Sequence, residues 1–535
     1  MPLSSSAATT IPKQNDSLPV PQSLWRKIKD GIVALSAANL VFIRAWFAML
    51  FDKDFGYFNK IPVAAPALLA LLANIMGAAA VLWLLMQARR RSVPRWSVAM
   101  GFVLFCFLPV YPIDFVRAEY FKIADYQIVA ALLRPWVTAL AVLCFGLLIW
   151  QHVGAARIVR SLFIIFAPLA VFSLGKMLLV LAGIVRLSQA SSEIPLPPPC
   201  FEVASNQVRV VWIIFDEMDQ RLSFDERPSG VSLPEFDRLR DEGMYATNAR
   251  SVGTHTKVSM PALICGQSVM AATLAGPSEL QLTLAEDGRS VDWKSLPNLF
   301  SDARKMGLNT ALVGWYHPYA RVLGKDLNYC AWYPLSGFEP ARASTFLRSM
   351  ERQICSLAFT FQGRRDFAAL CRESLSESLD VVTNSQYSVM LLHLPPPHKP
   401  GVYLPREDRF TCFGMPKTQG YFNNLQLADR ELGRIRCAMN QAGVAGRTWI
   451  LISADHWWRE SKLYDGREDH RVPFLLKPPD GEPGRTFTGM FNTVLTHDLI
   501  LSIMKSEVTN LDSAEHWLNE RLISAPPVYG SSQDE

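Results

Sequence analysis

The fold is decided by residues Gly446–His456, which read G-R-T-W-I-L-I-S-A-D-H. Trp449–Ile452 is a short apolar run after a glycine-containing turn, and its composition suits a strand buried on both faces. The run leads into Asp455 and His456, a carboxylate beside an imidazole. Ligands of open α/β sheets bind beyond the carboxyl ends of the strands. An oxygen and a nitrogen at such an end suit a divalent metal ion, although Asp455 could instead simply cap the next helix.

Three other apolar runs also end at residue types that commonly bind metals or phosphates in proteins. They are Val208–Phe215 before Asp216 and Glu217, Thr310–Val313 before His317, and Val389–Leu392 before His393 and, past three prolines, His398. The carboxyl ends of neighbouring parallel strands meet at one edge of a sheet, so the four runs together predict one site. Each residue also has an ordinary alternative: the acids could cap a helix, His317 could pack in an aromatic core, and His398 could be solvated.

Composition separates the first third of the chain from the rest. The chain has 535 residues, of which half are hydrophobic and 19% are charged, and the apolar excess lies in the first third. The net charge is +5, and no basic block is interleaved with aromatic residues, so binding to nucleic acid is not expected. None of the nine cysteines forms a C-x-x-C pair, which argues against a zinc ribbon.

The first third predicts a membrane domain at 25–186, after a cytoplasmic tail at 1–24. A span needs about 20 apolar residues, and five segments approach this length. They are Ile32–Phe51, Pro62–Met86, Val98–Ile113, Ala131–Trp150 and Leu162–Val185. Basic residues precede the first and fifth segments and follow the second, which places the N-terminus in the cytoplasm. We therefore expect a multi-pass protein of the cytoplasmic (inner) membrane, with everything after Val185 extracytoplasmic. The membrane domain could be a tether or, with a lipid substrate, part of the enzyme.

The rest of the chain predicts an α/β domain at 208–523. A Pro/Ser-rich linker at 187–207 precedes it, and a tail at 524–535, rich in Pro, Gly, Ser and acids, is expected to be disordered. Between them, apolar runs alternate with helix-like polar stretches, the pattern of a mostly parallel sheet. The predicted fold is thus an N-terminal α-helical membrane bundle plus an α/β domain with a mostly parallel central sheet.

Several motifs resemble the alkaline phosphatase/sulfatase superfamily. Leu233–Gly266 reads L-P-E-F-D-R-L-R-D-E-G-M-Y-A-T-N-A-R-S-V-G-T-H-T-K-V-S-M-P-A-L-I-C-G. Its start resembles the sulfatase pattern P-x-L-D-x-L-x-x-E-G, and its end resembles S-x-P-A-L-L-T-G. Ser453–His456 resembles the family's S-D-H, and His470–Pro473 resembles its H-x-V-P. The motifs follow the family's order over about 208–505, which implies an alkaline phosphatase-like fold.

The segment around Thr256 indicates a branch of this superfamily. Sulfatases carry C/S-x-P-S/A-R, with the first residue converted to formylglycine. Ser259 could fill that position, but Leu263 stands where the arginine belongs. G-T-H-T-K-V-S-M-P instead resembles the G-T-x-T-x-x-S-x-P of membrane phosphoethanolamine transferases, whose second threonine is the nucleophile. Phosphoglycerol transferases also use threonine. Val252 and Ala262 stand where the phosphoethanolamine enzymes carry cysteines.

The resemblance implies a metal-dependent transfer of a phospholipid headgroup. Thr256 would attack phosphorus, release diacylglycerol, and pass phosphoethanolamine or phosphoglycerol to an envelope glycan or lipid. The expected metal is zinc, with Mn²⁺, Mg²⁺ and Ca²⁺ as alternatives. The implied metal ligands are Asp216, Glu217, Thr256, Asp455 and His456, with Asp216 favoured over Glu217. His398 and His470 would be catalytic with Thr256, whereas Lys257, His317 and His393 would contact the substrate.

Two other functions remain open at this point. One is a sulfatase-like hydrolase of sulfuric or phosphoric esters, in which water is the final acceptor. The other is a non-catalytic lipid-binding or regulatory protein with this fold.

Overall fold

The computed structural model describes residues 24–52, 54–58, 65–88, 101, 105–121, 131–132, 134–185, 194–334, 345–358, 360–525 and 527. Contacts divide the chain into two units. The first contains Met1–Ile43, Ile75–Phe121 and Pro135–Leu174, and the second contains Arg44–Asn74, Lys122–Arg134 and Gly175–Glu535. The predicted tails at 1–24 and 524–535 lie, except for a few residues, outside the described part of the chain.

The described part of the N-terminal region is helical. Its helices are α1 (Leu24–Val41), α2 (Ile43–Leu50), α3 (Phe55–Phe58), α4 (Ala65–Ala88), α6 (Val110–Glu119), α8 (Pro135–Trp150), α9 (His152–Ile165) and α10 (Ala167–Leu181). One helix, at Ala65–Gln87, is long and apolar enough to cross a membrane. Two bent pairs, α1 with α2 at 67° and α9 with α10 at 43°, raise the number to three if each pair is one span. The described residues thus provide one to three spans where the sequence predicted five, and the predicted third span lies partly outside them.

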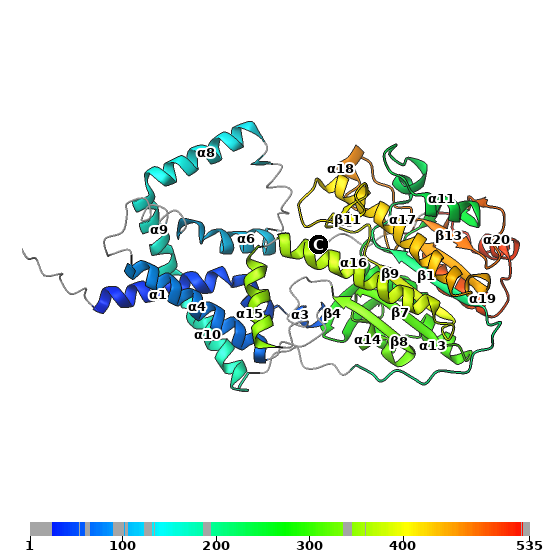
Figure 1. Cartoon of the computed structure of the whole chain (residues 1–535). Helices are drawn as coiled ribbons and strands as arrows, with labels where there is room; N and C mark the ends of the chain where they lie inside the picture. The colour runs from blue at the N-terminus through cyan, green and yellow to red at the C-terminus, as the bar shows by residue number, and fades with distance from the viewer. Residues whose placement is uncertain are drawn as a thin grey trace, which may run out of the picture. The chain divides into compact units, whose positions relative to one another are not determined.

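The second unit is built on an eight-stranded sheet (Figure 1). Its strand order is β14 (Arg485–Phe487), β2 (Met244–Ala246), β13 (Phe474–Lys477), β12 (Thr448–Ser453), β1 (Arg209–Phe215), β9 (Val389–Leu394), β7 (Thr310–Tyr316) and β8 (Tyr329–Pro334). The five strands from β12 to β8 are parallel, and β13 is antiparallel to both of its neighbours. The predicted mostly parallel central sheet is therefore confirmed.

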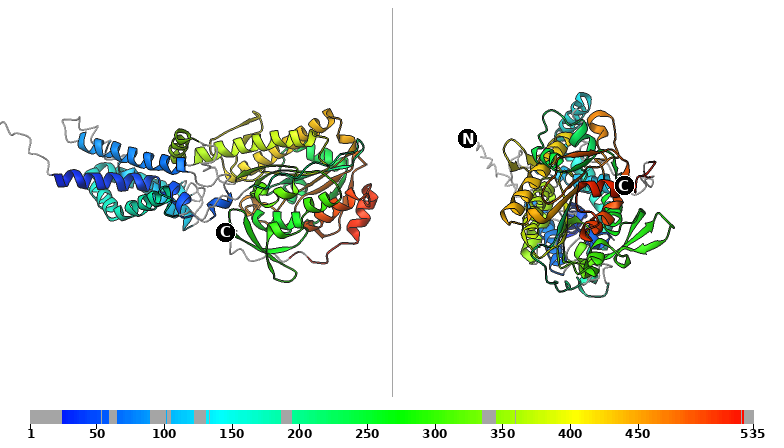
Figure 2. Two further views of the ribbon diagram at one scale, coloured as in Figure 1. Left: turned by 90° about the horizontal axis from the view of Figure 1, so that it is seen from below. Right: turned by 90° about the vertical axis from the view of Figure 1, so that its right-hand side faces the viewer.

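Helices cover both faces of this sheet, which explains its continuous apolar strands (Figure 2). In β1, Val210, Trp212 and Ile214 enter one core, and the alternate residues enter the other. The first core is shared with α12 (Thr256–Cys265), α13 (Leu299–Lys305), α14 (Tyr319–Val322), α19 (Thr496–Met504) and α20 (Leu511–Asn519). The second is shared with α11 (Pro234–Asp241), α16 (Thr360–Thr383) and α17 (Lys417–Gln441).

Smaller elements complete the unit. They are the sheet of β4 (Val269–Gly276), β5 (Glu279–Leu284) and β6 (Ser290–Asp292), the pairs β3 (Ala249–Arg250) with β15 (Phe491–Asn492) and β10 (Tyr403–Leu404) with β11 (Arg409–Phe410), and helices α15 (Phe346–Cys355) and α18 (Lys462–Asp465).

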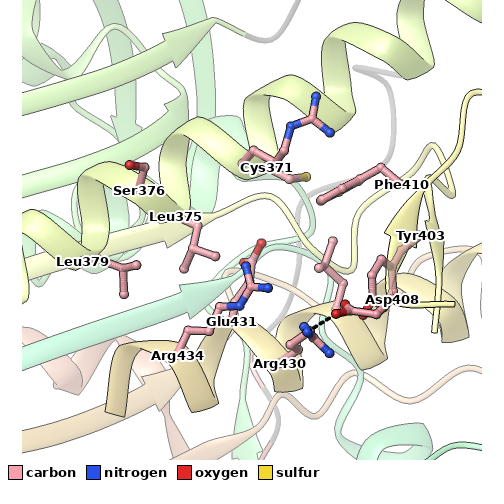
Figure 3. Close-up of a pocket in the computed structure, with 12 residues that line it drawn as sticks. Cys371, Leu375, Ser376, Leu379, Tyr403, Asp408, Phe410, Arg430, Glu431 and Arg434 are labelled. Atoms are coloured by element: carbon pink, nitrogen blue, oxygen red, sulfur yellow. Dashed lines mark hydrogen bonds and ion pairs between the residues drawn. The ribbon is translucent and has the colours of Figure 1, made fainter. Parts of the chain in front are cut away.

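A cavity of about 200 Å³ lies between α16, α17 and the β10–β11 pair (Figure 3). Glu431, on its wall, is 1% exposed, and neither carboxylate oxygen has a hydrogen-bond partner in the described structure. Burial raises the pKa of Glu431 well above its usual value. None of the predicted site residues lines this cavity.

Candidate metal centre

The parallel strands bring the predicted residues together at one edge of the sheet. In the register, Ile214 of β1 lies between His393 of β9 and Ser453 of β12. Asp216 follows β1 directly, and Asp455 follows β12 after one intervening residue. The residues that follow the separate apolar runs therefore lie close together, because the strands that end at this edge are adjacent.

Asp216, His393 and Asp455 form a compact group that could hold a metal ion. One ligand atom from each lies within 4.8 Å of the others, and all three side chains are fully buried. Asp216 Oδ1, His393 Nε2 and Asp455 Oδ2 have no hydrogen-bond partner within the described residues. Buried polar atoms normally have hydrogen-bond partners. Three buried ligand atoms that lie close together without such partners are therefore suited to binding a cation.

Two histidines present a ring nitrogen to this group. The Nδ1 of His456 lies 2.9 Å from the carbonyl of Trp457, which can only accept, so Nδ1 donates and Nε2 is the nitrogen that faces the group. The Nδ1 of His393 lies 2.9 Å from the hydroxyl of Tyr319. Burial lowers the pKa of His393 to about 4, so its ring is neutral, as a metal ligand must be. The sequence predicted that His393 would contact the substrate, whereas the structure places it among the candidate metal ligands.

Thr256 lies beside the same group. It is the first residue of α12 and is buried. Its Oγ1 lies 3.3 Å from Asp216 Oδ2 and 3.4 Å from His456 Nε2. Helix N-termini present free N–H groups and a positive dipole, so an anion bound to Thr256 would be stabilised there. The fold thus brings the predicted nucleophile, Asp216, Asp455 and His456 together.

The two adjacent acids, Asp216 and Glu217, have different environments. Burial, reinforced by Asp455, raises the pKa of Asp216 to about 8. Burial also acts on Glu217, but His398 and Arg459 outweigh it and lower the pKa of Glu217 to about 2. Arg459 donates to Glu217 Oε1 through Nε at 3.2 Å and Nη2 at 3.1 Å. The guanidinium of Arg459 therefore neutralises the charge of Glu217, whereas no arginine or lysine forms such a pair with Asp216 within the described residues.

Backbone strain accompanies these residues. Glu217, after β1, has a φ of 63°, and Tyr316, at the end of β7, has a φ of 75°. Non-glycine residues rarely adopt this left-handed region, and those that do cluster at functional sites. Two such residues at the ends of two strands of one sheet support the assignment of this edge as the site.

The other predicted residues lie around the group. His398, after β9, is half-buried, with its ring centroid 5.0 Å from that of Trp315. Lys257 follows Thr256 in α12 and is half-buried. His470 is 41% exposed and stacks on Trp457, with the ring centroids 4.0 Å apart, so it lies beside the site on its exposed rim.

His317 occupies a different position from the one expected. Its Nε2 lies 3.1 Å from the carbonyl oxygen of Thr256, and its Nδ1 lies 2.8 Å from the hydroxyl of Tyr57. Burial lowers the pKa of His317 to about 3, so the ring is neutral. Both nitrogens have partners inside the protein. His317 therefore contacts the backbone of Thr256, whereas the sequence predicted that it would contact the substrate.

Two residues of the site were missed from the sequence. His255 precedes the nucleophile; its Nδ1 lies 2.6 Å from Thr254 Oγ1, and its buried Nε2 has no partner in the described structure. Burial lowers the pKa of His255 to about 4. Arg459 neutralises Glu217. Two sequence features could have indicated these residues. His255 lies between the two threonines of G-T-H-T, and Arg459 lies three residues after His456.

The α/β domain thus carries a candidate metal site at one edge of a mostly parallel sheet, beside a hydroxyl at a helix N-terminus. The sulfatase family model matches residues 209–505, which is more than half of the chain. The chain therefore belongs to the sulfatase family, within the alkaline phosphatase-like superfamily, as the motifs led us to expect. Members of this superfamily use divalent metals, and the family places the chemistry of the site among sulfuric and phosphoric esters.

Solved structures resemble the chain only distantly. Ps i-CgsB in complex with k-i-k-neocarrahexaose is 15% identical, with 59% of this chain and 76% of that chain covered and a TM-score of 0.43. The PsFucS1 sulfatase from Pseudoalteromonas sp. is 13% identical, with 56% and 68% covered and a TM-score of 0.41. The phosphonate monoester hydrolase of Agrobacterium radiobacter is 14% identical, with 56% and 74% covered and a TM-score of 0.40. No curated protein matches the sequence.

Proposed function

We propose that the protein is a membrane-bound, metal-dependent transferase. It would move a phosphoethanolamine or phosphoglycerol headgroup from a phospholipid to an envelope glycan or lipid through a phospho-Thr256 intermediate. The observation that carries the proposal is the position of Thr256 Oγ1, 3.3 Å from Asp216 and 3.4 Å from His456 at the start of α12. A threonine hydroxyl is a poor nucleophile and needs such neighbours to act.

Asp216, His393, Asp455, His456 and Thr256 would hold the metal ion. Zinc suits this mixture of oxygen and nitrogen ligands, with Mn²⁺, Mg²⁺ and Ca²⁺ as alternatives. When bound, the ion would stabilise the negative charge of the nucleophile and of the phosphoryl oxygens. Glu217, the other implied ligand, would instead keep Arg459 at the rim of the site.

Proton transfers can be assigned to residues of the chain. Thr256 Oγ1 donates its hydrogen to Asp216 Oδ2, so this carboxylate would take the proton as Oγ1 bonds to phosphorus. The phosphorus–oxygen bond to diacylglycerol breaks, and its oxygen would take a proton from His398. In the second half, the acceptor hydroxyl would give a proton to His398 as its oxygen bonds to phosphorus, and the bond between phosphorus and Thr256 Oγ1 would break. Asp216 would then return the first proton to Thr256 Oγ1.

The remaining predicted residues would bind the substrate at the rim. Lys257 follows Thr256 in the first turn of α12, where its ammonium group would attract the phosphate. His470, which is partly exposed beside Trp457, would assist the entering acceptor. A lipid donor would reach the site from the membrane. We propose that five spans anchor the protein in the cytoplasmic membrane and that the catalytic domain is extracytoplasmic.

Replacing the nucleophile tests this function. In vesicles containing phosphatidylethanolamine and phosphatidylglycerol, Thr256→Ala should lower diacylglycerol release at least 1,000-fold, because no oxygen remains to attack phosphorus. Thr256→Ser should keep measurable activity. Mass spectrometry of the unmodified protein should find the headgroup phosphate on Thr256 and identify the donor by its mass.

Ser259 supplies the matched control. It lies three residues further along α12, is fully buried, and occupies the position that a sulfatase would convert. Ser259→Ala should keep diacylglycerol release. If Ser259→Ala is inactive and Thr256→Ala is fully active, the nucleophile is Ser259 and the transferase assignment is wrong.

The sulfatase family match favours hydrolysis as the second candidate function. The two functions differ in the final acceptor, since a hydrolase releases the free headgroup and a transferase attaches it to another molecule. A radiolabelled headgroup that appears in water-soluble product, with or without added envelope lipid, would establish the hydrolase.

A further inference from the structure

The nucleophile is supported from behind by a histidine that belongs to neither the metal group nor the surface. His317 is fully buried, and its Nε2 lies 3.1 Å from the backbone oxygen of Thr256. Its ring packs edge-on against Trp293, with centroids 5.0 Å apart, and Tyr319, with centroids 5.7 Å apart. The ring therefore has little freedom, and its one polar contact with α12 is made to the nucleophile itself.

Tyr57 provides the partner for the nitrogen of His317 that faces away from Thr256. A backbone carbonyl can only accept, so the contact with Thr256 requires hydrogen on Nε2 of His317. In the neutral ring, Nδ1 then has a lone pair and accepts from the hydroxyl of Tyr57, 2.8 Å away. Without that hydroxyl, the buried Nδ1 would lose its partner, and one of the two hydrogen bonds that hold the ring against Thr256 would be missing.

Tyr57 lies far from the α/β domain in sequence but belongs to the same structural unit. It lies on α3, in the segment between the first two predicted membrane spans, and is only 1% exposed. Arg321 Nη1 donates to the Gly56 oxygen at 2.8 Å, and the Phe58 ring packs edge-on against Tyr316 with centroids 5.2 Å apart. Each residue of α3 from Gly56 to Phe58 thus contacts the segment that carries His317.

We propose that Tyr57 is a positioning residue for Thr256, acting through His317, so that the loop between the first two apolar segments is part of the catalytic unit. This inference rests on the proposed function, because it assumes that Thr256 is the nucleophile. It also assigns the membrane region a role beyond tethering: the region supplies the hydroxyl that orders the support of the nucleophile.

Kinetics of the full-length protein test the proposal. In vesicles containing phosphatidylethanolamine and phosphatidylglycerol, Tyr57→Phe should lower kcat for diacylglycerol release about tenfold and leave KM unchanged, since one buried hydrogen bond is lost behind the nucleophile. Tyr403→Phe is the matched control. Tyr403 is also buried, and its hydroxyl donates to Asp408 at 2.7 Å, outside the metal group. It should keep the parental kcat. A parental kcat in Tyr57→Phe would overturn the proposal.

A spectroscopic measurement distinguishes this failure from failure of the proposed function. With ¹⁵N-labelled histidine in the detergent-solubilised full chain, His317 should show hydrogen on Nε2, and the Nδ1 signal should shift in Tyr57→Phe because the hydrogen bond to Nδ1 is lost. The His317 signal is assigned by its loss in His317→Gln. If the parental protein releases no diacylglycerol, the proposed function fails, and the Nδ1 signal alone decides whether Tyr57 holds His317. An unchanged Nδ1 signal in Tyr57→Phe would refute that role of Tyr57.

Discussion

Asp216 and Glu217 are adjacent acids with opposite roles. Glu217 accepts two hydrogen bonds from Arg459 and stays ionised, whereas Asp216 shares its buried surroundings with Asp455 and has a pKa raised to about 8. An uncompensated pair of buried carboxylates is costly unless a cation lies between them. The two side chains point to different partners because Glu217 adopts a left-handed backbone conformation directly after Asp216.

This difference predicts the metal content of two neighbouring variants. Asp216→Asn should weaken zinc binding at least tenfold, because a charged ligand is lost. Glu217→Gln should bind zinc as the parental protein does, since Glu217 faces Arg459. Elemental analysis of the purified full-length proteins, after equilibration with zinc and gel filtration, measures both. Zinc loss in Glu217→Gln with retention in Asp216→Asn would reverse the assignment.

The residues of the site were predictable only to the extent that strand ends are visible in a sequence. Asp216, Asp455 and His456 follow apolar runs, and Thr256 lies in a recognisable motif, so their meeting could be predicted. His393 lies within β9, and the sequence does not show that its ring faces Asp216. His317 Nδ1 is hydrogen-bonded to the hydroxyl of Tyr57, which lies 260 residues earlier in the chain. No local sequence pattern indicates a contact over that distance.

At the scale of elements, α11 begins without a cap of its own. Leu233 precedes it and makes no side-chain cap, and Asp429 of α17 takes this role. The Asp429 Oδ1 accepts from the backbone nitrogens of Glu235 and Phe236, both at 2.9 Å. Burial raises the pKa of Asp429 to about 7, although these two hydrogen bonds oppose the shift. The cap thus ties α11 to α17 at the cost of a buried acid.

This cap predicts how stability depends on pH. The folded protein holds the Asp429 proton more tightly than the unfolded chain does, so this stabilisation is present below about pH 4 and is lost as the pH rises to about 7. Asp429→Asn keeps the accepting oxygen without the charge. The free energy of unfolding of Asp429→Asn should therefore gain on the parental value more at pH 8 than at pH 4.5, by about 3 kcal/mol at most. An equal difference at both pH values, measured by thermal unfolding in detergent, would contradict this prediction.

The elements themselves were largely predictable, because a sheet covered on both faces needs continuous apolar strands. The runs before Asp216, His317, His393 and Asp455 became β1, β7, β9 and β12. The strand order was not predictable, since it depends on how the intervening helices return across the sheet. The cavity beside Glu431 was also not predictable, because it arises from the packing of α16 against α17.

For the whole molecule, the proposed topology places the α/β domain on the outer side of the cytoplasmic membrane. The basic residues flanking the apolar segments favour the outer side. Cys437, on α17, is exposed and provides a probe of this orientation, whereas Cys371, on α16, is fully buried.

Labelling of these cysteines tests the orientation. A membrane-impermeant maleimide added to intact spheroplasts should modify the peptide that contains Cys437, as measured by mass spectrometry, because an exposed thiol reacts readily. Cys371 should react only after denaturation and serves as the internal control. If Cys437 reacts only after the membrane is permeabilised, the catalytic domain is cytoplasmic.

The wide spacing of the metal group along the chain has a consequence for biosynthesis. Thr256 and His456 are 200 residues apart, and Asp216 comes earlier still. Asp216 and Thr256 therefore emerge from the ribosome before Asp455 and His456 have been synthesised. A metal ion held by this group would therefore be acquired only after His456 has been synthesised. If the domain is exported as it is made, such an ion would come from the pool outside the cytoplasm, and the supply there would limit how much metal-bound protein forms.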